Sequence, residues 1–120
     1  MNVVGLRTGT VTFLFTDIEG STRLLQEQGN IYPELLERHA RLIRAAVADA
    51  GGVEVSTEGD AFFCVFSSAP AALTAAVMAQ RALVSHPWPE GCAVRARMGL
   101  HTGVGALGGD NYVGLDVHRA

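Results

Sequence analysis

Residues 53–66 have the sequence VEVSTEGDAFFCVF, and this stretch decides the fold class. Two short apolar runs, residues 53–56 and 61–66, flank the polar turn Thr-Glu-Gly-Asp. Runs rich in valine and phenylalanine on either side of a glycine-containing turn are typical of a β-hairpin. We therefore expect two antiparallel strands, with Asp60 at the tip that joins them.

A strand and a long helix are indicated on the N-terminal side of this hairpin. Residues 10–16 alternate valine and phenylalanine with threonine and leucine, which predicts a strand. A turn at residues 17–22 leads into a helical run from about Arg23. Residues 33–50 begin with proline, carry apolar residues at helical spacing and end before two glycines, so they predict an amphipathic helix.

On the C-terminal side, residues 70–85 begin with proline and are rich in alanine, which predicts a second helix. A proline-rich break then precedes a strand expected at residues 94–101. The order β-α-β-β-α-β is the split pattern of a ferredoxin-like α/β sandwich. We expect the helices around residues 23–50 and 70–85 to cover one face of its sheet.

This topology makes a prediction about two carboxylates. A right-handed crossover makes the first two strands parallel, and the third strand fills the gap between them, antiparallel to both. Asp17 ends the first strand and Asp60 begins the third, so both should meet at one edge of the sheet. Separately, Asp17 could be a helix N-cap and Asp60 part of a tight turn. Their convergence favours a divalent-metal site.

The residues around these carboxylates suit a phosphate ligand. Mg²⁺ prefers carboxylate and carbonyl oxygens and usually keeps positions for water and substrate phosphates. Gly20 permits close backbone approach, and the amides of Gly20, Ser21 and Thr22 lie at a helix N-terminus where anions bind. Together, the metal ligands and amides predict a triphosphate site.

Composition limits the other possibilities. The chain has 120 residues, is 48% hydrophobic and carries a net charge of -3, which indicates one globular domain and argues against nucleic-acid binding. No apolar stretch approaches the ~20 residues of a membrane span, and we expect a cytoplasmic protein. Cys64 and Cys92 have neither metal-ligand spacing nor a disulfide framework, and we expect neutral or buried thiols. His39 and His86 have no convergent partners, which indicates surface or partly buried side chains.

Three segments carry a family resemblance: FLFTDIEGST at residues 13–22, TEGDAFF at residues 57–63 and RMGLHTG at residues 97–103. In this order and spacing they resemble the class III adenylate and guanylate cyclases, of the bacterial, actinobacterial type. The resemblance implies an N-terminal extension at residues 1–9. It also implies a catalytic domain at residues 10–120 that is incomplete at its C-terminus.

The resemblance also implies a function. Cyclases of this class convert ATP or GTP to the 3',5'-cyclic nucleotide and pyrophosphate with two Mg²⁺ or Mn²⁺ ions. Asp17, Asp60 and the backbone carbonyl of Ile18 would be the metal ligands. Catalytic groups come from both chains of a dimer, so a homodimer is implied. A second copy is also the simplest cover for the sheet face opposite the helices, which we expect to be exposed.

Several positions depart from the family pattern. Ser56 occupies the place of a base-selecting lysine, and Asn111 the place of its base-reading partner, so the choice between ATP and GTP stays open. His118 aligns with the ribose-orienting asparagine. The transition-state arginine would fall four residues after His118, beyond Ala120.

Two interpretations of these departures stay open. The chain is either a segment of an active cyclase or a degenerate cyclase-homology domain that binds nucleotide and regulates by dimerising. Domains that resemble this one are often joined to helix-turn-helix regulators in actinobacteria, so further regulatory domains are expected in the parent protein. The isolated chain is expected to have little or no cyclase activity.

Overall fold

Eight helices and strands follow one another in the part of the chain that the computed structural model describes, residues 9–108 and 111–113. In order they are β1 (Gly9–Ile18), α1 (Ser21–Glu27), α2 (Tyr32–Asp49), β2 (Val53–Glu58), β3 (Ala61–Phe66), α3 (Ala69–Ser85), β4 (Ala96–Gly108) and β5 (Asn111–Val113).

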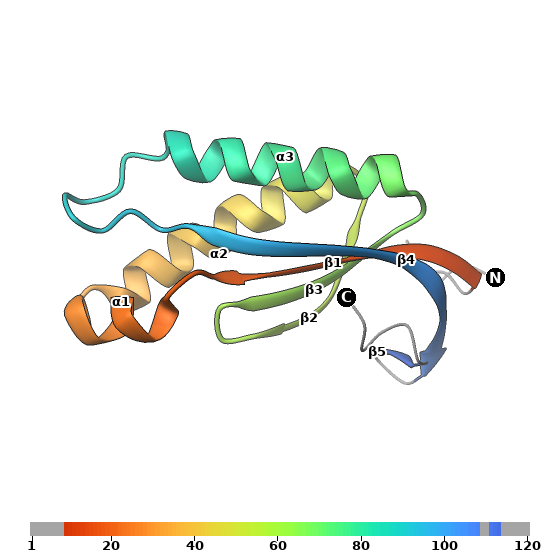
Figure 1. Cartoon of the computed structure of the whole chain (residues 1–120), viewed down its shortest axis with the longest axis horizontal. Coiled ribbons are helices and arrows are strands. Elements are labelled where there is room, and N and C mark those ends of the chain that lie inside the picture. The colour runs from red at the N-terminus through yellow and green to blue at the C-terminus, as the bar shows by residue number, and fades with distance from the viewer. Residues whose placement is uncertain (1–8, 109–110, 114–120) are drawn as a thin grey trace.

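The strands form one antiparallel sheet in the order β2-β3-β1-β4-β5. This confirms the ferredoxin-like α/β sandwich, with β1 between β3 and β4. Helices α2 and α3 lie together on one face of the sheet (Figure 1). Strand β1 runs two residues further than expected, because Asp17 and Ile18 still pair with Arg97 and Ala96 of β4. The three residues of β5 are too few for the sequence pattern to reveal.

The main core lies between the sheet and the two long helices. Strands β1 and β3 contribute Leu14, Phe62, Cys64 and Phe66, which pack against buried side chains of α2 and α3. The buried positions of α3 are mostly alanines, so this helix can lie close to the sheet. A Cβ on Gly52 would come within 2.3 Å of the Phe66 ring, so only glycine fits at the entry to β2. Both cysteines are buried and free, as expected.

His39 is an exception to the expectation of a surface or partly buried histidine. It lies on α2 with 0% of its surface exposed, and its ring packs edge-on against Phe62 at a centroid distance of 5.9 Å. Neither ring nitrogen has a hydrogen-bond partner in the described part of the chain. Burial is the main cause of a lowered His39 pKa, which the negative charges of Asp60 and Asp17 partly oppose. The ring is therefore held neutral under the sheet.

The sheet face opposite the helices is not open along its whole length, which corrects one premise of the dimer prediction. Val11, Phe13, Phe63 and Val65 form a second buried cluster on this face. At this end of the sheet β4 curves away toward β5, at the lower right of Figure 1, and β5 comes into contact with β2. A second copy is therefore not needed to cover the middle of this face. The opposite end, where β1 runs into α1, is more exposed.

Candidate active site

Asp17 and Asp60 meet at one edge of the sheet, as the topology predicted. Asp17 is the penultimate residue of β1, and Asp60 lies in the two-residue turn between β2 and β3. The Asp60 Oδ2 atom accepts a hydrogen bond of 2.7 Å from the backbone N–H of Ile18, directly after Asp17. Asp17 is not a helix N-cap, because the strand continues through it and Gly20 holds the N-cap position of α1.

Arg97 joins these carboxylates from the neighbouring strand. It lies opposite Asp17 in the β1–β4 register, and opposed residues of antiparallel strands project on the same face. Its Nε and Nη2 atoms donate hydrogen bonds of 2.9 Å each to Asp17 Oδ1 and Oδ2. This bidentate contact is the main reason that the pKa of Arg97 is raised.

A shallow hollow of about 180 Å³ lies beside this ion pair. Gly99 faces Phe15 across the β1–β4 pair, and the small residues Gly99 and Ala61 leave room around the phenyl ring. The hollow is lined by Phe15, Thr16, Asp17, Ala61, Arg97, Met98 and Gly99. The charged pair thus adjoins an aromatic surface, an arrangement that can take a ligand with both anionic and ring components.

Ser56 lies on the same sheet face because of a β-bulge in β2. The register shifts between Glu54 and Ser56, so that Val55 is an extra residue and Ser56 pairs with Phe63. Without that residue, the alternation of the strand would place Ser56 on the helix face. Phe63 stacks on Phe15 with ring centroids 4.5 Å apart, and Phe15 lines the hollow. On this sheet face, the stacked rings of Phe63 and Phe15 therefore lie between Ser56 and Asp17.

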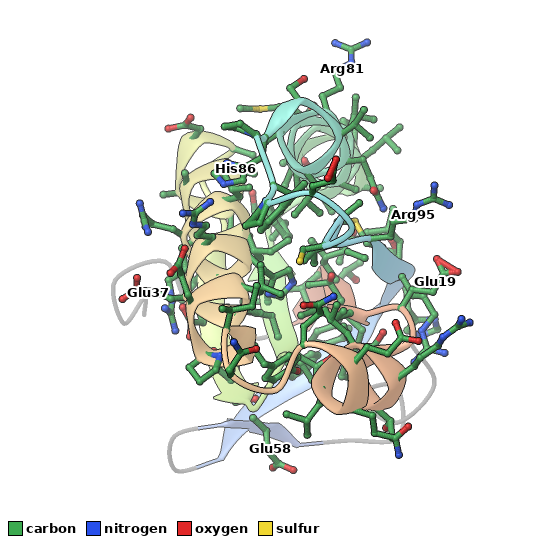
Figure 2. The ribbon with its side chains drawn as sticks, turned by 90° about the vertical axis from the view of Figure 1, so that its left-hand side faces the viewer. Glu19, Glu37, Glu58, Arg81, His86 and Arg95 are labelled. Carbon is green, nitrogen blue, oxygen red and sulfur yellow. The ribbon has the colours of Figure 1, made fainter. Side chains whose placement is uncertain are left out.

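The predicted phosphate-binding residues Gly20, Ser21 and Thr22 follow Asp17 closely in sequence. None of them lines the hollow beside the Asp17–Arg97 ion pair. Gly20 is in the left-handed region with φ 66°, and Ser21 and Thr22 open α1. Gly20 lines a separate hollow of about 300 Å³ between α1 and the segment before β4, together with Arg95. Glu19 and Arg95, both labelled in Figure 2, also line this second hollow. The backbone N–H of Glu19 donates a hydrogen bond of 2.7 Å to the carbonyl oxygen of Arg95.

Two further predicted residues lie at the end of the described part of the chain or outside it. Asn111 begins β5 and pairs with Gly108, but only its backbone is described. His118 lies outside the described residues. The roles predicted for both remain predictions, as do those of Gly20, Ser21, Thr22 and Ser56.

The donor set at the edge suits a hard divalent cation. Asp17 and Asp60 supply carboxylate oxygens, and the main chain of Ile18, directly after Asp17, is held by its hydrogen bond to Asp60. Oxygen-only donors favour Mg²⁺ or Mn²⁺ over softer metals. Within residues 9–108 and 111–113 no group of three or more His, Cys, Asp or Glu side chains is placed to hold a metal. The candidate site therefore relies on two carboxylates, with positions left for water and ligand.

The fold is thus an antiparallel α/β sandwich that carries two carboxylates, a guanidinium and an open hollow at one edge of its sheet. Residues 3–116 match the model of the adenylate and guanylate cyclase catalytic domain family. The chain belongs to this family.

Individual relatives agree with this assignment. An adenylate cyclase of Schizosaccharomyces pombe is 37% identical over 81 residues, which are 68% of this chain and 5% of that protein. The solved adenylate cyclase structure from Trypanosoma brucei, in its monomeric state, has a TM-score of 0.83 at 26% identity, over 94% of this chain and 67% of that chain. The structure of an adenylate/guanylate cyclase/hydrolase from Silicibacter pomeroyi has a TM-score of 0.81 at 28% identity, over 95% of this chain and 68% of that chain.

The chain spans a small fraction of the curated proteins that it matches, 5% of the Schizosaccharomyces pombe relative. Among the described residues, no helix combines the length and the apolar character that a membrane crossing requires.

Proposed function

We propose that this chain supplies the metal- and triphosphate-binding half of a cyclase active site, which converts ATP or GTP to the 3',5'-cyclic nucleotide and pyrophosphate. The observation that carries this proposal is the hydrogen bond of 2.7 Å from Ile18 N–H to Asp60, which fixes the hairpin tip against the end of β1. That contact brings the two carboxylates to one edge, as a metal-dependent phosphate site requires.

Asp17, Asp60 and the Ile18 carbonyl are the proposed ligands of two Mg²⁺ or Mn²⁺ ions. Bound there, such ions would supply positive charge to the triphosphate and favour loss of the ribose 3'-hydroxyl proton. Asp60 keeps its place through the Ile18 N–H, and Asp17 is ordered by Arg97. Positioning is the main contribution that a protein makes to phosphoryl chemistry, and the Asp60 carboxylate is already held in place before any ligand arrives.

The remaining residues are assigned by the chemistry of the nucleotide. Arg97 carries a guanidinium that can pair with phosphate oxygens, and the amides of Gly20, Ser21 and Thr22 can donate to others. Ser56 can hydrogen-bond a base edge without adding charge. In a homodimer, Asn111 and His118 of one chain would complete the site of the other by reading the base and orienting the ribose.

A regulatory role is the second candidate, and the neutral Ser56 favours it. A domain with an intact metal edge and an altered base-reading position could bind nucleotide and signal through dimerisation without turnover. The two functions differ in one observable, because only the enzyme releases pyrophosphate.

The test measures binding and turnover on the same sample. Mn²⁺ with a non-hydrolysable ATP or GTP analogue should raise the melting temperature of the chain, because ligands that bind only the folded state stabilise it. Asp17→Asn and Asp60→Asn should abolish this rise. Glu58→Gln is the matched control, since it removes the same charge from the exposed side chain next to the turn, labelled in Figure 2.

Cyclic nucleotide formation by the isolated chain should be low even where binding is intact. Ser56 brings no charge to the position where the family has a base-selecting lysine, and His118 stands where the family has a ribose-orienting asparagine. Turnover near that of intact cyclases would contradict this expectation. A melting temperature that does not respond to Mn²⁺ and nucleotide would contradict the proposed function itself.

A further inference from the structure

The ion pair between Asp17 and Arg97 occupies both groups that the proposed site needs. Two N–H groups of Arg97 engage both carboxylate oxygens of Asp17 at 2.9 Å. The Arg97 and Asp17 side chains are 66% and 37% exposed, so ligands in solution can reach the pair without any unfolding. A metal ion and the guanidinium therefore compete for the same oxygen atoms.

Binding of the divalent cation alone, or of the triphosphate alone, is disfavoured. A divalent cation must displace the guanidinium from Asp17 and is then repelled by the released positive charge. A triphosphate must take Arg97 from Asp17 and is then repelled by the bare carboxylate. Glu19 and Asp60 also act on Arg97 electrostatically, so negative charge near the released guanidinium is not limited to Asp17.

We propose that the Asp17–Arg97 ion pair makes metal binding and triphosphate binding depend on each other. A metal–triphosphate complex gives each member of the pair a new partner: the cation takes Asp17 and the phosphates take Arg97. Either ligand alone leaves one member unpaired beside a like charge. This inference rests on the proposed function, because it assumes that Asp17 is a metal ligand.

The test uses single ligands, so that binding of metal to phosphate in solution does not enter. Mn²⁺ alone is titrated into the wild-type chain, Arg97→Ala and the matched control Arg95→Ala, which loses the same charge from an exposed side chain two residues earlier. Free Mn²⁺ is followed by electron paramagnetic resonance. Arg97→Ala should bind Mn²⁺ about three- to tenfold more tightly than wild type, and Arg95→Ala should differ by less than about twofold.

The reciprocal arm uses inorganic tripolyphosphate with EDTA, followed by calorimetry. Asp17→Asn should bind it about three- to tenfold more tightly than wild type, because Arg97 is released. Asp60→Asn removes the same charge at the same edge without breaking the ion pair, and it should show a smaller gain. Arg97→Gln serves as a second variant that keeps a polar side chain, and it should repeat the Mn²⁺ result of Arg97→Ala.

The outcomes separate this inference from the proposed function. If Mn²⁺ binds and Asp60→Asn abolishes that binding, but Arg97→Ala matches Arg95→Ala, the metal site stands and the mutual dependence is wrong. A tripolyphosphate affinity in Asp17→Asn no greater than in Asp60→Asn overturns it equally. If no variant binds Mn²⁺ at millimolar concentration, both the metal site and the inference fail.

Discussion

Strand β1 has a buried end, at Val11 and Phe13, and a solvent-accessible end, at Asp17. At the first end, Val11 and Phe13 are 1% and 0% exposed within a cluster that includes Phe63 and Val65 of β3. At the second end, the Asp17 side chain is 37% exposed and paired with Arg97. One strand thus carries a buried apolar cluster at one end and a solvent-accessible ion pair at the other. Substitutions at the two ends should therefore have separable effects on folding and on ligand binding.

The largest expected effect is a loss of stability when a side chain at the buried end of β1 is truncated. Phe13→Ala should lower the free energy of unfolding by about 3–5 kcal/mol, because it leaves a cavity among packed side chains. Asp17→Ala should change it by no more than about 1 kcal/mol, since it removes a solvent-accessible ion pair. Urea denaturation of both variants and of the milder Phe13→Leu measures the difference. Equal losses at Phe13 and Asp17 would show that the two ends are not separable.

A second prediction concerns the helix-covered face behind β3. Burial raises the pKa of the Cys64 thiol to about 12 from an ordinary 9.0. A difference of three pKa units leaves about 1000-fold less thiolate near pH 8, and the thiolate is the reactive form. Alkylation by iodoacetamide, followed by mass spectrometry of the Cys64 peptide, should be slow in the folded chain and rapid in urea. Fast modification of the folded chain would place Cys64 in a more open environment.

The smallest expected effect concerns His39, which is buried between α2 and the helix-covered face of the sheet. Burial lowers the His39 pKa below 6.5, so the unfolded state binds more protons at any pH between the two values. The free energy of unfolding should be highest above about pH 6.5 and should fall as the pH drops through that window. His39→Leu should flatten this dependence in urea titrations between about pH 7 and 5. A slope that persists in His39→Leu would assign it to other groups.

Sequence patterns were sufficient for the arrangement of the elements and for the meeting of Asp17 with Asp60. Both follow from the order of strands and helices, because a split β-α-β unit fixes which strand ends are neighbours. The position of Arg97 was within reach as well. Arg97 begins the segment at residues 97–103 that carries the family resemblance, and pairing β4 against β1 residue by residue places it opposite Asp17.

Other features depend on information that the residue pattern does not contain. The bulge at Val55 changes the face on which Ser56 lies, and a period-two pattern cannot reveal one extra residue. The complete burial of His39 depends on how α2 packs against Phe62 and the sheet. The burial of Val11 and Phe13 on the sheet face opposite the helices cannot be deduced from their alternation along β1 alone. Each of these is a three-dimensional property rather than a local preference.

The bulge in β2 has a consequence for behaviour at high concentration. β2 is one of the two edge strands of the sheet, and edge strands expose unpaired backbone groups that can recruit a strand from another molecule. Here the extra residue interrupts the regular spacing of those groups, and the exposed carboxylate of Glu58 lies at the far end of the strand. A neighbouring chain would have to match an irregular ladder and accept a negative charge. This margin of the molecule is thereby protected against strand-by-strand aggregation.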